Sequence, residues 1–272
     1  MITFPKAKIN LGLSISGKRA DGYHDIETVF YPVGLTDALE FVISSDSVKT
    51  DELVVTGINI GAHHDNNLVI LAVKKLRETF PVPFLKIHLH KVIPSGAGLG
   101  GGSSDAAYIL KGINKCLNLS VSDSILRGIA LELGSDCPFF INPVPSLATG
   151  RGEVLKPVGA VLDGYYIILL NPGISISTRD AYLNSDISRS EKDLQLMLNQ
   201  PVSDWKKIIK NDFENYVFSL YPQISGLKKA LYKCGAVYSS MSGSGSTVYG
   251  IFSEKPEITE KLRKYLIFEG IL

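Results

Sequence analysis

Residues 94 to 107, PSGAGLGGGSSDAA, place five glycines between Gly96 and Gly102 and run directly into a pair of serines. Glycine lets the backbone approach phosphate oxygens closely, and a helix that begins at Ser103 or Ser104 adds unpaired N–H groups and the positive end of its dipole. We therefore expect an anion site, with one of these serines capping the helix. Asp105 is awkward here, because a carboxylate in the first helical turn repels phosphate unless it faces away or helps to hold Mg²⁺.

Three nucleotide-binding loops can be compared with this segment. Gly96, Gly98 and Gly101 fit G-x-G-x-x-G, but the helix after the loop leads to CLNLSVSDSIL rather than to the strand and acidic residue of a dinucleotide fold. A P-loop needs a lysine where this chain has serine or aspartate, and the HRD and DFG motifs of a protein kinase do not occur in the sequence. A mobile surface turn remains as an alternative, and the flanking strand and capped helix argue against it.

Lys8 and Asp136 are of the types that phosphoryl transfer to an alcohol needs, namely a cation and an acceptor for the hydroxyl proton. Asp136 follows Gly134, which suits the end of a helix, and precedes Cys137-Pro138, so we expect the chain there to be extended. Taken alone, Asp136 is typical of a turn or cap aspartate and Lys8 of a solvated lysine. Together with the glycine loop, they favour catalysis.

The elements that must position these residues follow from the hydrophobic periodicity. Apolar residues alternate from Ala7 to Ile15, which predicts a half-buried strand with Lys8 and Asn10 on its polar face. Further strands are predicted over 27–34, 38–45, 85–93 and 164–170, and helices over about 65–77, 103–117 and 122–133. A hairpin over 236–252, which includes SGSGST, and a closing helix over 256–266 complete the pattern. The interspersed order predicts an α+β protein of two domains, 1–157 and 158–272.

Composition narrows the class of partner. The 272 residues include 28 Lys and Arg against 27 Asp and Glu, so the net charge of +1 gives no case for a nucleic-acid or membrane partner. Three widely spaced cysteines indicate a reducing, cytoplasmic setting, and we expect neither a signal peptide nor a membrane span. His88 with His90 and His63-His64-Asp65 lack a third ligand at a recognised spacing, so no protein-built metal site is expected. A small-molecule partner is favoured, and the oligomeric state stays open.

Taken together, PKAKINLGL, RADGYH, GLGGGSSDAA, LGSDCPFF and SGSGST resemble the GHMP kinases in order and spacing. Within this superfamily, the combination is most similar to the kinases of the non-mevalonate isoprenoid pathway that act on a cytidine-diphosphate-linked methylerythritol. The resemblance implies an N-terminal domain like ribosomal protein S5 domain 2, which binds ATP and carries the catalytic residues, and a ferredoxin-like C-terminal domain that binds substrate. It also implies ATP as phosphoryl donor, with Mg²⁺, and transfer to the 2-hydroxyl.

The resemblance assigns roles by position. Asp136 matches the catalytic base and Lys8 its partner; Asn10, Tyr23, His24, Thr178 and Tyr182 match substrate contacts, with Tyr23, His24 and Tyr182 around the cytosine. The residues that match the ATP site are Asn67, Leu68, Pro94, Ser95, Gly96, Ala97, Gly98, Leu99, Gly100, Gly101, Gly102, Ser103 and Ser104. A GHMP kinase for another alcohol, such as homoserine or mevalonate, and a non-catalytic nucleotide-binding module are the alternatives.

Overall fold

The computed structural model describes residues 1–45, 47–59, 66–185 and 193–272. The chain packs into two compact units, each assembled from separate segments. Unit 1 comprises Met1–Ala7, Leu35–Ser95 and Gly100–Pro143, and unit 2 comprises Lys8–Gly34, Gly96–Leu99 and Val144–Leu272. These units are defined by packing alone, so the division into 1–157 and 158–272 stays a prediction.

Unit 1 contains a four-stranded sheet in the order β1-β4-β6-β5, formed by Ile2–Thr3, Ala38–Ile43, Leu85–Lys91 and Glu52–Gly57 respectively. β6 pairs antiparallel with β4 and parallel with β5. Alternate residues of β6 are buried, beginning with Leu85, so Lys86, His88 and His90 lie on the exposed face, as the alternating sequence indicates.

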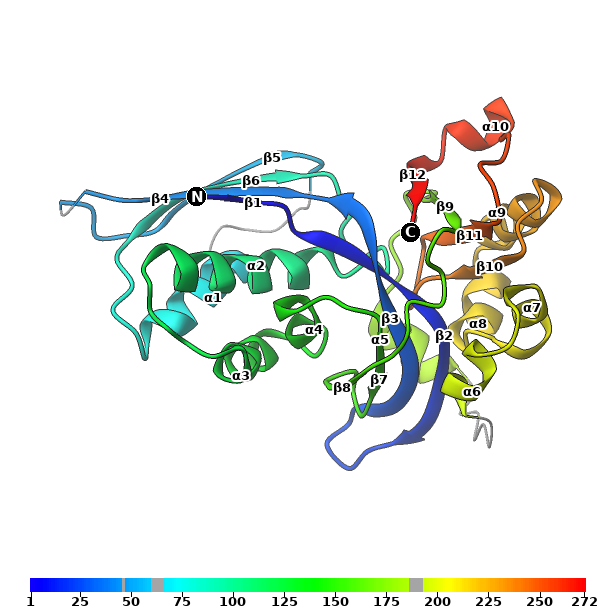
Figure 1. The fold of residues 1–272 in the computed structure, drawn as a ribbon, viewed down its shortest axis with the longest axis horizontal. Helices are drawn as coiled ribbons and strands as arrows, with labels where there is room; N and C mark the ends of the chain where they lie inside the picture. Colours follow the sequence, from blue (N-terminus) through cyan, green and yellow to red (C-terminus); the bar gives the residue numbers. More distant parts are fainter. Residues whose placement is uncertain (46, 60–65, 186–192) are drawn as a thin grey trace. The chain divides into compact units, whose positions relative to one another are not determined.

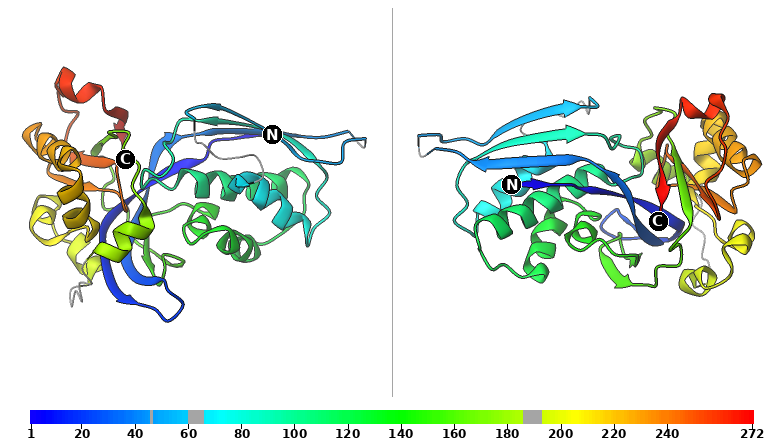
Figure 2. Two further views of the ribbon diagram at one scale, coloured as in Figure 1. Left: turned by 180° about the vertical axis from the view of Figure 1, so that it is seen from behind. Right: turned by 45° about the horizontal axis from the view of Figure 1, so that its top comes forward.

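Helices α1 (Leu68–Arg77) and α2 (Gly101–Cys116) lie on the other face of this sheet (Figures 1 and 2). Helices α3 (Asp123–Leu133) and α4 (Cys137–Ile141) pack against these two helices on the side away from the sheet. The side chains of Asn67 and Ser122 cap α1 and α3. α2 packs closely on the sheet at Gly112, where an added Cβ would lie 2.9 Å from the ring of Phe41. No helix in the described part of the chain is both long and apolar enough to cross a membrane.

The first sheet of unit 2 has the order β2-β3-β7-β8, from strands Lys6–Lys18, His24–Thr36, Ser146–Thr149 and Val154–Pro157. The prediction that β2 is half-buried is wrong, because every residue from Ala7 to Leu13 is buried. Its polar face is covered as well as its apolar face, so Lys8 and Asn10 are not solvated.

The second sheet of unit 2 has the order β10-β11-β9-β12, with Tyr238–Met241, Val248–Phe252, Tyr166–Leu170 and Leu266–Ile271, all paired antiparallel. The predicted hairpin of β10 and β11 is confirmed. The predicted closing helix over 256–266 is wrong except for the single turn Glu260–Arg263, and from Leu266 onward the chain pairs with β9 as a strand. The remaining helical segments of unit 2 are α5 (Thr178–Asn184), α6 (Leu194–Leu198), η2 (Val202–Asp204), α7 (Trp205–Ile208), α8 (Phe213–Leu220), α9 (Pro222–Lys233) and α10 (Glu260–Arg263).

Candidate active site

The glycine loop leads into α2 as expected, but the helix begins earlier. Gly100, at φ 70°, occupies the N-cap position, and no side chain caps the helix. Ser103 and Ser104 are therefore residues of the first turn, and the prediction that one of them is the cap is wrong. A left-handed glycine cap leaves the first N–H groups of a 16-residue helix without a side-chain acceptor, which is the arrangement that binds anions.

Within unit 2, the middle of the loop is held by the SGSGST segment. The Ser242 hydroxyl donates to the Gly98 carbonyl at 2.7 Å, and the Thr247 N–H donates to the Ala97 carbonyl at 3.3 Å. A Cβ on Gly98 would lie 1.9 Å from the Ser242 carbonyl oxygen, and Gly98 has φ 77°. Only glycine fits this position, both sterically and conformationally.

Lys8 lies against the same loop segment, because its N–H donates to the Leu99 carbonyl at 3.0 Å. Its ammonium group donates to Asn10 Oδ1 at 2.6 Å and lies 4.7 Å from the centre of the Phe30 ring. Asn10 Nδ2 in turn donates to the Thr28 hydroxyl at 3.0 Å. Lys8 is only 4% exposed, so this network holds a buried cation in one orientation.

Asp136 lies in unit 1, at the N-cap position of α4, with φ −82° and ψ −19°. The expectation of an extended chain is wrong: Pro138 stands in the first turn of α4, where its missing N–H costs nothing, so a helix can begin immediately after Asp136. Burial raises the pKa of the neighbouring Cys137 thiol to about 11. The negative charge of Asp136 adds to this increase, and a hydrogen bond with Ser103 opposes it. The Asp136–Cys137 turn is thereby placed beside the first turn of α2.

Asp105 pairs with Lys91, whose Nζ lies 2.7 Å from Asp105 Oδ2. Lys91 also pairs with Asp37, and all three side chains are buried. Burial raises the pKa of Asp105 to about 7; Lys91 opposes this increase and Asp37 adds to it. Lys91 thus offsets the negative charge of Asp105, and whether the Asp105 carboxyl group faces bound phosphate or helps to hold Mg²⁺ stays a prediction.

The predicted adenine residues lie near this cluster. Asn67 caps α1 through a bond from the Val69 N–H, and the Leu68 side chain is in van der Waals range of a Cβ added at Gly102. A pocket is lined by both of them together with Asn66, Lys91, Ser95, Gly102 and Asp105. Unit 1 thus brings Asn67 and Leu68 together with Ser95 and the start of α2.

The predicted cytosine contacts lie in unit 2. The rings of His24 and Tyr182 stack with their centroids 5.0 Å apart and their planes 10° from parallel. Tyr23 is 53% exposed and has the Arg151 guanidinium 4.7 Å from its ring centre. Thr178 shares a hydrogen bond of 3.0 Å with the Ser244 hydroxyl, next to the segment that holds the glycine loop.

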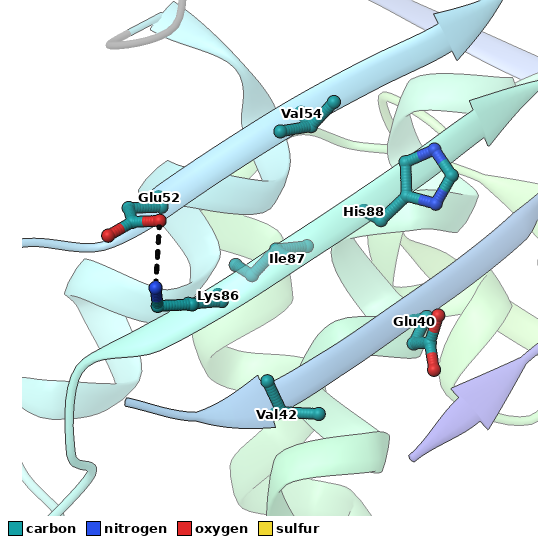
Figure 3. A pocket seen from close by; sticks show the side chains of 7 residues that line it. All are labelled: Glu40, Val42, Glu52, Val54, Lys86, Ile87 and His88. Carbon is teal, nitrogen blue, oxygen red and sulfur yellow. Dashed lines mark ion pairs between the residues drawn. The ribbon is translucent and has the colours of Figure 1, made fainter. Parts of the chain in front are cut away.

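A second pocket lies on the exposed face of the unit 1 sheet (Figure 3). Strands β4, β5 and β6 supply its side chains, among them Val42, Val54 and His88, and Lys86 forms an ion pair of 3.5 Å with Glu52. None of the residues predicted for catalysis or binding lines it. Within the described ranges, no group of three or more His, Cys, Asp or Glu side chains could hold a metal ion. His63, His64 and Asp65 lie outside the described residues.

Sequence reasoning missed several residues that shape this site. Asp37 and Lys91 carry no motif and become visible only when β4, β6 and α2 are packed together. Asn211 is similar: its Nδ2 donates to the carbonyls of Met241 and Gly243, both at 2.8 Å, and so fixes the segment around Ser242. Asp105, in the first turn of a helix predicted to bind anions, was the one signal in the sequence that pointed to a buried cation nearby.

Comparison with known proteins is consistent with this geometry. The family models described as GHMP kinases N terminal domain and GHMP kinases C terminal match residues 67–142 and 193–267. The 4-diphosphocytidyl-2-C-methyl-D-erythritol kinase of Bacteroides fragilis strain YCH46 is 48% identical over 96% of this chain and 95% of its own length. The enzyme of the same name from Porphyromonas gingivalis is 47% identical over 95% of this chain and 94% of its own.

Solved structures of related kinases resemble this chain in fold. A crystal structure of 4-(cytidine 5'-diphospho)-2C-methyl-D-erythritol kinase matches with a TM-score of 0.78 and 30% identity, over 92% of this chain and 90% of that one. Homoserine kinase from Cytophaga hutchinsonii, at 16% identity and a TM-score of 0.64 over 96% of this chain and 88% of that one, shares the fold. The predicted α+β kinase fold is confirmed. The chain belongs to the GHMP kinases and, among them, to the 4-diphosphocytidyl-2-C-methyl-D-erythritol kinase family.

Proposed function

We propose that this protein transfers the γ-phosphoryl group of ATP to the 2-hydroxyl of 4-diphosphocytidyl-2-C-methyl-D-erythritol, a step of the non-mevalonate route to isoprenoid precursors. The substrate is the one that the relatives' names give. The observation that carries the proposal is the burial of Lys8 against the glycine loop, with its N–H on Leu99 and its ammonium group fixed by Asn10. A lysine that served only solubility would not be desolvated and oriented in this way.

In the proposed mechanism, Asp136 accepts the proton of the substrate hydroxyl and Lys8 stabilises the negative charge of the transferring phosphoryl group. A general base of this kind typically contributes about 10²- to 10⁴-fold in rate, so positioning and charge neutralisation must supply the rest. The location of Asp136 beside the first turn of α2 supports its role, since the phosphates are proposed to bind at that helix end.

The proposed ATP site uses the chain from Pro94 to Ser104, with Asn67 and Leu68 near the adenine. The uncapped N–H groups of α2 suit phosphate oxygens, and the ammonium group of Lys91 offsets the negative charge of Asp105 nearby. Mg²⁺ is proposed to enter the site together with ATP, where it would help to neutralise the charge of the phosphates.

The proposed cytosine site is bounded by His24 and Tyr182, with Tyr23 and Thr178 as further contacts. A flat ring between the two walls needs a spacing of roughly 7 Å, which is twice the contact separation of about 3.5 Å between carbon atoms. The two rings are 5.0 Å apart, so cytosine must separate them on entry. Asn10 is proposed to contact substrate from the position in which it holds Lys8.

The test is turnover of pure protein with ATP, Mg²⁺ and the cytidine substrate, followed by ADP release and by ³¹P NMR of the product. Homoserine and mevalonate serve as competing acceptors. We expect phosphorylation of the cytidine substrate alone, with Asp136→Asn and Lys8→Met each losing at least about 100-fold in kcat. Preferential turnover of another alcohol, or an Asp136→Asn variant with full activity, would reject the corresponding part of the proposal.

A further inference from the structure

Three charged side chains are buried together where β4 begins and β6 ends, and the proposed chemistry uses none of them. Asp37, Lys91 and Asp105 are 1%, 3% and 2% exposed. Lys91 Nζ pairs with both carboxylates. Removing charged groups from water is costly, and one carboxylate would already neutralise one ammonium group. A second buried carboxylate therefore calls for a reason beyond charge balance.

Asp37 also binds the backbone. Its Oδ1 accepts the N–H groups of Val92 and Ile93, at 2.5 and 2.9 Å. These two residues come directly after β6 and directly before Pro94, where the glycine loop begins. Asp37 thus fixes the direction in which the chain leaves the sheet. Asp37 is itself anchored, because its N–H donates to the Pro5 carbonyl at 3.0 Å.

Lys91 connects this end of the loop to the other end. It is the last residue of β6, and its ammonium group pairs with Asp105, the fifth residue of α2. The same ammonium group would lie 3.3 Å from a Cβ on Gly101, so it passes directly over the first residue of the helix. Through Lys91 and through the two N–H groups, the Asp37 carboxylate therefore acts on both ends of the loop.

We propose that Asp37 is a positioning residue for nucleotide binding, which holds the two ends of the glycine loop so that the first N–H groups of α2 meet the phosphates. The inference rests on the proposed function, because it takes the ligand of this loop to be ATP. It adds to that function a residue that touches no reactant and belongs to none of the sequence motifs.

Unit 1 offers a matched control at the opposite end of β6. Asp51 Oδ1 accepts the N–H of Leu85, the first residue of that strand, at 3.0 Å. Its two oxygens also bond to Arg77 at 2.7 and 2.8 Å. Asp51 and Asp37 are therefore equivalent in chemistry, each joining a strand end to a cation, but only Asp37 adjoins the glycine loop.

The experiment compares Asp37→Ala, Asp37→Asn and Asp51→Ala in the full-length protein. ATP affinity is measured by calorimetry, the KM values and kcat by turnover, and loop mobility by hydrogen exchange of peptides covering 94–107 without nucleotide. We expect Asp37→Ala to weaken ATP binding on the order of tenfold, equivalent to about 1.4 kcal/mol, and to speed exchange across the loop. The KM for the cytidine substrate should not change.

Asp37→Asn keeps an oxygen for the two N–H groups but loses the charge that attracts Lys91, so its ATP affinity should lie between those of wild type and Asp37→Ala. Asp51→Ala should lose comparable stability while keeping wild-type ATP affinity and wild-type exchange over 94–107. If the Asp37 variants resemble Asp51→Ala in both ATP affinity and exchange over 94–107, Asp37 has only a structural role and the inference is wrong. Asp37→Asn decides this question even if Asp37→Ala does not fold. Wild-type protein that binds ATP but ignores the cytidine substrate would reject only the proposed function, whereas protein that binds no ATP would reject both.

Discussion

Replacing Asp105 by asparagine should change the pH dependence of stability rather than the fold. Asp105 is the second carboxylate on a single buried ammonium group, and Lys91 keeps Asp37 as a partner when Asp105 loses its charge. Burial raises the pKa of Asp105 from the usual 3.8 to about 7 in the folded protein. The folded state therefore binds more protons than the unfolded state between these two values, and stability falls as pH rises from about 4 to about 7.

The size of the effect follows from the pKa shift. One pKa unit is worth about 1.4 kcal/mol, so the three or so units between 3.8 and 7 give about 4 kcal/mol once the group is fully ionised. Between pH 5 and pH 8, roughly 2 to 3 kcal/mol of this amount is lost. In Asp105→Asn that component is absent, because the amide does not titrate. The buried amide N–H₂ of the asparagine costs stability, but equally at every pH.

The assay is urea unfolding of wild type and Asp105→Asn at pH 5, 6, 7 and 8, with the difference in unfolding free energy plotted against pH. From pH 5 to pH 8, the unfolding free energy of the variant should rise by about 2 to 3 kcal/mol relative to that of wild type. This change is independent of the difference in stability between the two proteins at pH 5. Carbon-detected NMR of the Asp105 carboxyl should show an inflection near pH 7. Parallel stability curves for the two proteins would refute the reasoning, because they would mean that Asp105 is ionised at ordinary pH without penalty.

Four further outcomes follow from the contacts. Gly98→Ala should lose ATP binding and about 2 kcal/mol or more of stability, since its Cβ would clash with Ser242 and its φ is left-handed. Gly128→Ala is the control: this position in α3 is uncrowded, so the variant should gain up to about 1 kcal/mol of stability. Calorimetry measures ATP binding by the two variants, and thermal melts measure their stability. Thr28→Val should lower kcat on the order of tenfold with little change in either KM, because it removes the partner that orients Asn10 toward Lys8; unchanged kcat would show that this network is dispensable. Tyr182→Ala should raise the KM for the cytidine substrate on the order of tenfold and leave the KM for ATP unchanged, and equal effects on both would argue against a cytosine wall. A thiol reagent at pH 8 should label exposed Cys116 rapidly and buried Cys137 slowly, with fast labelling of Cys137 in native protein contradicting the raised thiol pKa.

Local signals predicted the elements that carry the site. The apolar period of two over β6, the cap of α1 and the turn residues between β10 and β11 all lie within a few residues of what they determine. The glycine loop could be recognised for the same reason, since the spacing of its glycines is a property of one short segment.

The errors arose where distant segments decide the outcome. β2 was expected to have a solvated polar face, but Asn10 receives a bond from the Tyr249 hydroxyl and its N–H reaches Ser242, both far along the chain. A helix was predicted over 256–266, but only Glu260–Arg263 is helical, and the chain from Leu266 to Ile271 forms a strand that pairs with β9. The Asp37–Lys91–Asp105 cluster is invisible in sequence because its members come from three elements, and no spacing rule connects them.

The bonds of Ser242 also bear on how the protein acquires its site during synthesis. This single side chain joins residues 144 positions apart, at Gly98, and 232 positions apart, at Asn10. Contacts over such separations form late and slowly, because the entropy of closing a long loop must be overcome before they stabilise anything. A nascent chain on the ribosome carries the complete glycine motif long before it has the hairpin that holds it. The glycine loop is thus one of the earlier parts of the candidate site to be synthesised and one of the last to reach its final shape.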